Sequence, residues 1–322
     1  MTVAATTSAS SGKLVEVSAA DFDLAITLDS GQVFHWETSG DGFVGTIGSQ
    51  AVYVEQRGDS LMIAHDKLDR KYRSSCQKLV REYFALDHPL GEICASFPSD
   101  AAMNAARDFC RGLRIIRQPK WECLATFICS SMKQVAHIRQ ISHKLRERFG
   151  ESRRIRDEVV YPFPSPERIA GSSEKDLRKC ALGYRAKNLL ATARQIASGE
   201  VDLERLAQRS DVDLRSSLCK LAGVGAKVAN CVMLFAYERL SAFPIDVWIE
   251  RVLREKYFPR TRKLNAARMR VFTQKYFGDH GGYAQQYLFH HARKSRAKTN
   301  KSRGTARLSP SRACDNVSVL NS

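Results

Sequence analysis

The stretch Leu221–Cys231, with two glycines two positions apart, is the sequence feature that most constrains the fold of this chain. Residues from Asp213 to Lys220 have the pattern of a helix end, and the run from Val228 to Leu240 has the apolar spacing of another helix. Gly223 and Gly225 therefore predict a very short hairpin between two helices, and both are expected to be needed for backbone freedom and close approach. The free N–H groups and dipole at the start of the second helix favour a phosphate.

An amine and a carboxylate follow this hairpin. Lys227 lies two positions after the second glycine, and Asp246 lies nineteen positions later, after Pro244, where a further helix is expected to begin. Placed at two neighbouring helix starts, they can act as a nucleophile and its partner. The simpler alternatives are that Lys227 is a solvated helix lysine and that Asp246 caps the helix starting at Val247, a role compatible with catalysis.

Charge indicates a polyanionic partner. The net charge is +17, and residues 292–322 carry eight Lys/Arg and one acid, so the body of the chain retains +10. The nine cysteines are scattered without CxxC pairs, which favours reduced, intracellular thiols. The first twelve residues lack the features of a secretory signal, and no apolar run suits a membrane span, so no membrane partner is expected. The histidines lack the spacing of a metal site, so no metal is expected.

Hydrophobic spacing changes once along the chain. From Leu14 to about His65 it alternates, which predicts an antiparallel sheet of short strands that include Leu24–Ile26 and Val33–Trp36. From about Leu68 it is helical almost to Arg293. The expected fold is α+β, an N-terminal antiparallel sheet domain packed on a helical bundle that contains the hairpin, with a ligand crevice between them. The predicted divisions are a disordered N-terminus (1–12), a β-rich domain with flanking helices (13–105), a helical domain (106–293) and a basic disordered tail (294–322).

With the hairpin stretch, the chain resembles the base-excision DNA glycosylases of the helix-hairpin-helix Gly/Pro-Asp superfamily, and within it the 8-oxoguanine DNA glycosylase/AP lyases. The resemblance extends from about Leu14 to Phe289. It is strongest in the hairpin and in four further stretches, which follow in the right order: Ser30–Trp36, Phe127–Ser131, Leu182–Ala186 and Tyr283–Gln285.

The resemblance implies an enzyme that excises 8-oxoguanine and related oxidised purines from duplex DNA. Lys227 would attack the sugar and form a Schiff base, and β-elimination would then cleave 3′ to the abasic site. Asp246 would stabilise the cationic sugar in the transition state. Relatives that only hydrolyse the glycosidic bond lack a lysine at this position, so Lys227 also favours lyase activity.

Five further residues are expected to form the pocket for the extruded base. Cys231 and Phe235 share a helical stripe with the catalytic lysine and would be walls of the pocket, although such a stripe is normally core. The resemblance assigns the amide of Gln285 to the Watson–Crick edge and the ring of Phe289 to stacking. Gly31, otherwise a plain hairpin glycine between two strands, would accept a hydrogen bond at its carbonyl from the N7 hydrogen that 8-oxoguanine has and guanine lacks.

Other residues are expected to contact the DNA. Tyr184 would wedge into the duplex, and Arg185, otherwise a surface charge, would contact the orphaned cytosine. Met132 stands where animal and fungal members have an asparagine, and His137 where they have an arginine, which predicts weaker discrimination for cytosine opposite the lesion. Trp248 replaces a histidine frequent in the eukaryotic motif, which puts that phosphate contact in doubt.

The remaining expectations concern partners and alternatives. The partner is double-stranded DNA containing oxidised purines, and the protein is expected to be a monomer located with the DNA, in cytoplasm and nucleoid or in a nucleus. No cofactor is expected, because only Cys314 lies where iron–sulfur relatives carry four closely spaced cysteines. The basic tail could be a localisation signal or a DNA-binding arm. Two alternatives stay open: a glycosylase for another damaged base, and a non-catalytic helix-hairpin-helix DNA-binding protein.

Overall fold

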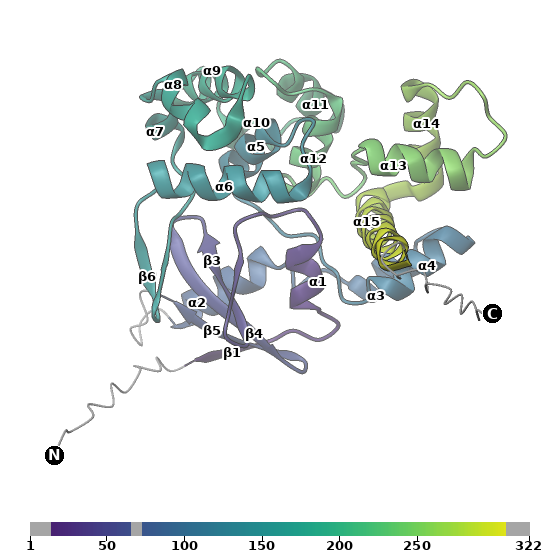
Figure 1. Ribbon diagram of the computed structural model, residues 1–322, viewed down its shortest axis with the longest axis horizontal. Coiled ribbons are helices and arrows are strands. Elements are labelled where there is room, and N and C mark those ends of the chain that lie inside the picture. Colours follow the sequence, from purple (N-terminus) through teal and green to yellow (C-terminus); the bar gives the residue numbers. More distant parts are fainter. Residues whose placement is uncertain (1–13, 66–72, 307–322) are drawn as a thin grey trace, which may run out of the picture.

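The computed structural model describes residues 14–65 and 73–306. An antiparallel sheet with strand order β1-β5-β4-β3-β2 forms the N-terminal part, and helices form most of the rest, as the alternating and helical spacings predicted (Figure 1). The five strands are β1 (Val15–Ser18), β2 (Glu37–Ser39), β3 (Gly42–Ile47), β4 (Gln50–Arg57) and β5 (Ser60–His65). The α+β fold class is therefore confirmed.

Both faces of the sheet are covered. One face packs against the helices α1 (Leu24–Asp29) and α2 (Arg73–Tyr83) in a core that includes Val54 and Ile63, which pair in adjacent strands. The other face buries Tyr53 against Ile155 of a small hairpin, β6 (Arg153–Ile155) and β7 (Glu158–Val160), which the sequence did not predict.

Two predicted strands are wrong. Leu24–Ile26 begins helix α1, because the Asp23 side chain caps the helix by accepting from the Ile26 N–H, at 2.8 Å. The Leu24 N–H donates to the Gln56 side chain of β4, also at 2.8 Å. Val33–Trp36 forms no strand and leads into β2.

The helical part is built around α5 (Lys120–Cys129), in which every residue from Glu122 to Cys129 is buried. Figure 1 shows α6 between the sheet and the helices above it. The further helices are α3 (Leu90–Ala95), α4 (Ala101–Phe109), α6 (Val135–Phe149), α7 (Pro166–Ala170), α8 (Glu174–Leu177), η2 (Arg178–Leu182), α9 (Arg185–Ala197), α10 (Leu203–Leu206), α11 (Asp211–Cys219), α12 (Ala226–Ala236), α13 (Val247–Val252), η3 (Leu253–Tyr257), α14 (Ala266–Phe277), η4 (Gly278–His280) and α15 (Gly281–Ala306).

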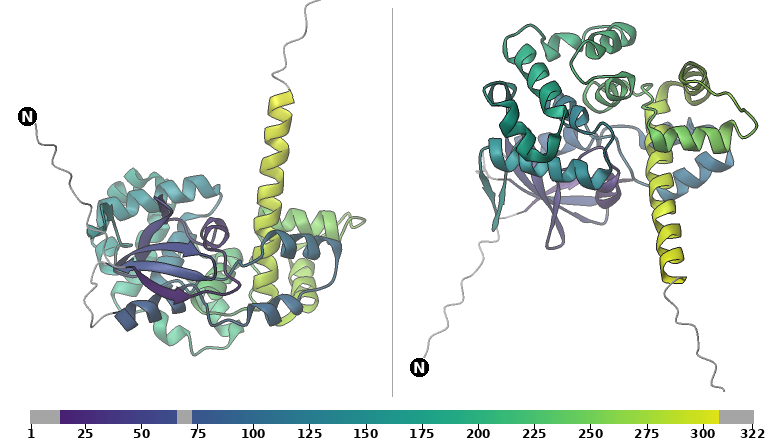
Figure 2. Two further views of the ribbon diagram at one scale, coloured as in Figure 1. Left: turned by 90° about the horizontal axis from the view of Figure 1, so that it is seen from below. Right: turned by 45° about the horizontal axis from the view of Figure 1, so that its top comes forward.

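Helix α15 continues beyond the rest of the fold (Figure 2). The predicted disordered tail from residue 294 is therefore wrong for 294–306, where Ala, Lys and Arg, all good helix formers, extend the helix. The expectations for residues 1–12 and 307–322 lie outside the described residues. The predicted boundary at 105/106 falls within α4, whose Met103 and Ala106 belong to the core of the helical part. The domain division stays a prediction. In the described part of the chain, no helix has the length and apolarity needed to cross a membrane.

Candidate active site

The hairpin between α11 and α12 has two different glycines. Gly223 has φ +81°, and a Cβ there would lie 2.8 Å from the Cβ of Asn188, so this position needs glycine. Gly225 caps α12 with φ −95° and ψ 179°, and no atom lies within 4 Å of an added Cβ. The expectation that both glycines supply backbone freedom is therefore wrong for Gly225, because any residue adopts this extended conformation. No side chain of the described residues caps this helix start, and a Cβ at Gly225 would point into open space.

Lys227 lies in the first turn of α12 and is half-buried. Its Nζ donates to the hydroxyl of Ser130 at 3.3 Å and lies 5.2 Å from the centre of the Phe127 ring. The Ser130 hydroxyl in turn donates to the Phe127 carbonyl, at 2.8 Å. The sequence did not single out Phe127 or Ser130 individually, although both lie in one of the stretches that carried the resemblance. They form the immediate surroundings of the amine.

Asp246 and Cys231 are close enough to Lys227 for its charge to act on both. Burial raises the pKa of Asp246, and the backbone N–H of Ile249 and the Lys227 charge oppose that rise. The carboxylate also caps α13, since its Oδ1 accepts from the Ile249 N–H at 2.9 Å. Burial raises the pKa of the Cys231 thiol to about 11, with Lys227 again opposing. The structure thus brings together the amine, the carboxylate and the thiol.

Phe235 packs against a ring next to the lysine. Its ring stacks on Phe127 with centroids 5.5 Å apart and planes 14° from parallel. Phe127 in turn faces the Lys227 amine, so the ring of Phe235 belongs to the packed layer that supports Phe127. Its assignment as a pocket wall stays a prediction.

Gly31 and Phe289 come together from opposite ends of the sequence. Gly31 has φ +87° and follows α1, so its interpretation as a hairpin glycine between two strands is wrong. A Cβ at Gly31 would lie 3.0 Å from the ring of Phe289 on α15. The carbonyl oxygen of Gly31 has no hydrogen-bond partner among residues 14–65 and 73–306. One turn before Phe289, the Gln285 side chain is only 4% exposed, yet its Oε1 accepts no hydrogen bond from the described residues.

A second group of predicted residues gathers around the loop that follows α5. Met132 is 90% exposed with φ +57°, and His137 is exposed near the start of α6. Tyr184 is also exposed, at the start of α9. Arg185, by contrast, is 5% exposed, and its Nε donates to the Ser131 carbonyl at 2.7 Å. In this structure, therefore, the guanidinium faces the backbone of the loop, and its contact with a cytosine stays a prediction.

Trp248 lies on α13, two residues after Asp246, and is half-buried. The guanidinium of Arg251 lies 5.7 Å from its ring centre, so the indole packs against a cation of the same helix.

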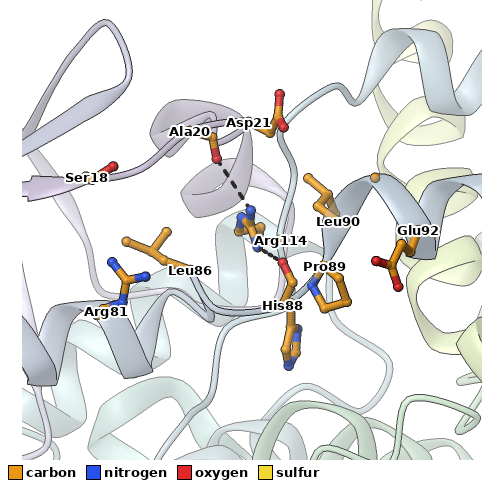
Figure 3. Close-up of a pocket in the computed structure, with 11 residues that line it drawn as sticks. Ser18, Ala20, Asp21, Arg81, Leu86, His88, Pro89, Leu90, Glu92 and Arg114 are labelled. Carbon is orange, nitrogen blue, oxygen red and sulfur yellow. Dashed lines mark hydrogen bonds between the residues drawn. The ribbon is translucent and has the colours of Figure 1, made fainter.

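A separate cavity of about 370 Å³ lies beside the sheet, and none of the site residues predicted from the sequence lines it (Figure 3). Arg114 is buried at this cavity, and its guanidinium donates to the carbonyls of Ala85, His88 and Ala20. It is thus a structural cation that holds three loop segments together. No group of three or more His, Cys, Asp and Glu that could hold a metal ion occurs in the described ranges.

Two family models match the chain in succession. The N-terminal domain of 8-oxoguanine DNA glycosylase matches residues 14–124, and the HhH-GPD superfamily of base excision DNA repair proteins matches residues 125–275. The second match includes the hairpin, Lys227 and Asp246.

Individual proteins agree with these family matches. A probable N-glycosylase/DNA lyase of Methanothermobacter thermautotrophicus is 29% identical, over 87% of this chain and 96% of the relative. The structure of MBOgg1 in complex with a low affinity DNA ligand superposes with a TM-score of 0.82 at 33% identity, covering 88% of this chain and 97% of that one. The 8-oxoguanine glycosylase/lyase of Clostridium acetobutylicum, in complex with double-stranded DNA containing cytosine opposite 8-oxoguanine, gives 0.80 at 29% identity, over 88% and 100%.

Proposed function

Because the chain belongs to the 8-oxoguanine DNA glycosylases of the HhH-GPD superfamily, we propose that it removes oxidised purines with Lys227 as nucleophile and Asp246 as its electrostatic partner. The protein is a DNA glycosylase and AP lyase that binds double-stranded DNA. The observation that carries the residue assignment is the position of the Lys227 amine, half-buried beside Ser130 and close enough to Asp246 for the two charges to interact. We expect a monomer that acts inside the cell, where duplex DNA is.

The amine and carboxylate divide the chemistry between them. As the glycosidic bond breaks, its electron pair leaves with the base, and positive charge develops on the sugar. The Asp246 carboxylate stabilises that charge, and the neutral amine of Lys227 forms a bond to C1′. Opening of the sugar ring gives the Schiff base. Loss of a C2′ proton then expels the 3′ phosphate, and water hydrolyses the Schiff base to free the lysine.

The base pocket would be formed by Gly31, Cys231, Gln285 and Phe289. An unpaired buried acceptor costs roughly 1–3 kcal/mol, so the orphaned Oε1 of Gln285 favours a ligand that brings a donor. The Watson–Crick edge of a guanine-type base carries two such donor groups. The free carbonyl of Gly31 can accept the N7 hydrogen that 8-oxoguanine has and guanine lacks, and the Phe289 ring offers a face for stacking. These features together select an oxidised purine.

Borohydride trapping tests the nucleophile. The wild-type protein, incubated with duplex carrying 8-oxoguanine opposite cytosine, is expected to give a covalent adduct on reduction of the Schiff base. Lys227→Gln removes the only atom that can form that bond, so the adduct should disappear and strand cleavage should fall by at least 10³-fold, roughly the loss on deleting a catalytic nucleophile. The matched control is Lys78→Gln, on the exposed face of α2.

Two results would contradict the proposal. An adduct that persists in Lys227→Gln would place the nucleophile elsewhere. Tight binding of the duplex by the wild type without any adduct would instead support a non-catalytic DNA-binding protein.

A further inference from the structure

Three buried glutamines from separate segments hold the backbone on both sides of Gly31. Gln286 of α15 is 2% exposed, and its Nε2 donates to the Ser30 carbonyl at 2.9 Å. Gln118, which precedes α5, donates from its Nε2 to the Gln32 carbonyl at 2.8 Å. The residues directly before and after Gly31 are therefore fixed through their carbonyl oxygens, whereas the carbonyl of Gly31 itself has no partner in the described part of the chain.

The side chain of Gln32 anchors this turn to the segment before α5. Its Nε2 donates to the Ser30 hydroxyl at 2.9 Å and to the Arg114 carbonyl at 2.8 Å, and its Oε1 accepts from the Ile116 N–H at 2.7 Å. Arg114 is itself held by its guanidinium contacts with three carbonyls, of which those of Ala20 and His88 are drawn in Figure 3. These bonds fix the turn to the segment before α5. Among them, the bond from Gln286 is the one that comes from α15.

Glycine makes this support necessary. With φ +87° and no Cβ, Gly31 has several backbone conformations of similar energy, so its own residue type does not fix the direction of its carbonyl. The bond from Gln286 fixes the preceding peptide group, and through it the rotation available to Gly31. Because Gln286 lies three residues before Phe289 on the same helix, it also ties the turn to the ring that a Cβ at Gly31 would contact at 3.0 Å.

We propose that Gln286 is a positioning residue for lesion selectivity, because it holds the Gly31 carbonyl in the direction and at the separation from Phe289 that an oxidised purine requires. The inference rests on the proposed function, in which that carbonyl receives the N7 hydrogen. Gln286 does not touch the base or the sugar. Its loss therefore weakens the distinction between 8-oxoguanine and guanine without altering the chemistry at Lys227.

Gln286→Met tests this, since methionine has a similar length and shape but no donor. Single-turnover excision is measured for 8-oxoguanine and for guanine, each opposite cytosine, and the lyase rate is measured on a preformed abasic site. We expect the selectivity ratio to fall about tenfold, the loss of one hydrogen bond of roughly average strength, while the lyase rate stays within twofold of wild type. Gln208→Met, at an exposed glutamine in the turn after α10, is the matched control and should change neither quantity.

Any other result overturns the inference, and one result also overturns the proposed substrate. Unchanged selectivity in Gln286→Met refutes the inference alone, and a lyase rate that falls in parallel with excision shows a general structural role and refutes it too. If that variant does not fold, Gln286→Asn keeps the amide but withdraws it by one methylene, and the same loss of selectivity is required. A wild-type protein that excises no 8-oxoguanine, yet cleaves abasic sites, refutes the proposed substrate and the inference with it.

Discussion

At the scale of single residues, Lys227 lies within electrostatic reach of the Asp246 carboxylate. Its Nζ meets a ring face and a hydroxyl, Phe127 and Ser130, both of which are neutral. The nearby carboxylate of Asp246 is partly withdrawn from water, since burial raises its pKa. A carboxylate in a dry environment interacts more strongly with positive charge that develops on a substrate than an exposed one does. The pair is therefore suited to a reaction that passes through a cationic sugar.

Met132 provides a test of opposite-base selectivity. Its 90% exposed side chain cannot donate hydrogen bonds, so we expect the wild type to cleave 8-oxoguanine duplexes opposite all four bases with rates within about tenfold of each other. Met132→Asn restores a donor and an acceptor at this position, and asparagine adopts the left-handed conformation, φ +57°, more readily than methionine. We expect it to raise the preference for cytosine about threefold or more.

Cleavage rates with the lesion opposite each base measure both effects. Lys78→Gln, a change at an exposed position of α2, is the control for general effects of a surface substitution. A strict cytosine preference in the wild type would refute the interpretation of Met132.

Site residues could be predicted from the sequence where they lie at a fixed offset from a recognisable motif. Lys227 and Asp246 were singled out in this way, and the structure places them within electrostatic reach. The inward orientation of Arg185 was not predictable, because its partner is the Ser131 carbonyl, which only the tertiary fold brings there. Gly31 and Phe289 were placed in one pocket only by the resemblance, and the structure brings them together. Neither position carries a local pattern that indicates the other.

At the scale of elements, the hairpin offers a matched pair of substitutions. Gly223→Ala places a Cβ in a left-handed conformation and 2.8 Å from Asn188, so we expect the free energy of unfolding to fall by about 1–3 kcal/mol. Gly225→Ala adds a Cβ into open space at φ −95°, so stability should change by less than about 0.5 kcal/mol. If a phosphate approaches the start of α12, Gly225→Ala should weaken DNA binding instead. Urea denaturation and duplex titration measure the two effects, and equal destabilisation by both changes would contradict this assignment.

The element predictions succeeded or failed for local reasons. The alternating and the helical spacing on the two sides of Leu68 each extend over many residues, so together they predict the α+β fold class. Leu24–Ile26 is too short for its period to separate strand from helix, and the outcome depends on the Asp23 cap and on Gln56, which is 32 positions away. The hairpin β6–β7 has strands of only three residues in a charged segment, so it lacks a detectable period.

At the scale of the whole molecule, the excess charge is unevenly placed. The segment from Arg251 to Lys275 contains nine Lys/Arg and one acid, Glu255. It comprises the end of α13, all of η3 and most of α14, which lie together at one end of the molecule (Figure 1), and α13 begins directly after Asp246. A concentration of positive charge next to Asp246 favours the approach of the DNA backbone to this side of the protein.

Acid should destabilise the whole fold through buried neutral histidines. Burial, with the nearby charge of Arg293, lowers the pKa of His290 to about 4, and burial and Arg146 lower the pKa of His35 well below its usual value. The unfolded chain binds these protons near pH 6.5 and the folded chain does not, so stability falls as the pH drops from about 6.5 towards 4. The raised pKa values of Glu122 and Asp246 act in the opposite direction.

His290→Gln removes one of these titrating groups and keeps a polar side chain. Between pH 7 and pH 5 the free energy of unfolding of the wild type should fall. In the variant it should fall by about 1–2 kcal/mol less, because the unfolded variant has one histidine fewer that binds a proton in this range. Urea denaturation at the two pH values measures the difference. In the exposed His137→Gln the wild-type pH dependence should persist, since that side chain meets solvent in both states. An unchanged pH dependence in His290→Gln would mean that His290 does not resist protonation in the folded protein.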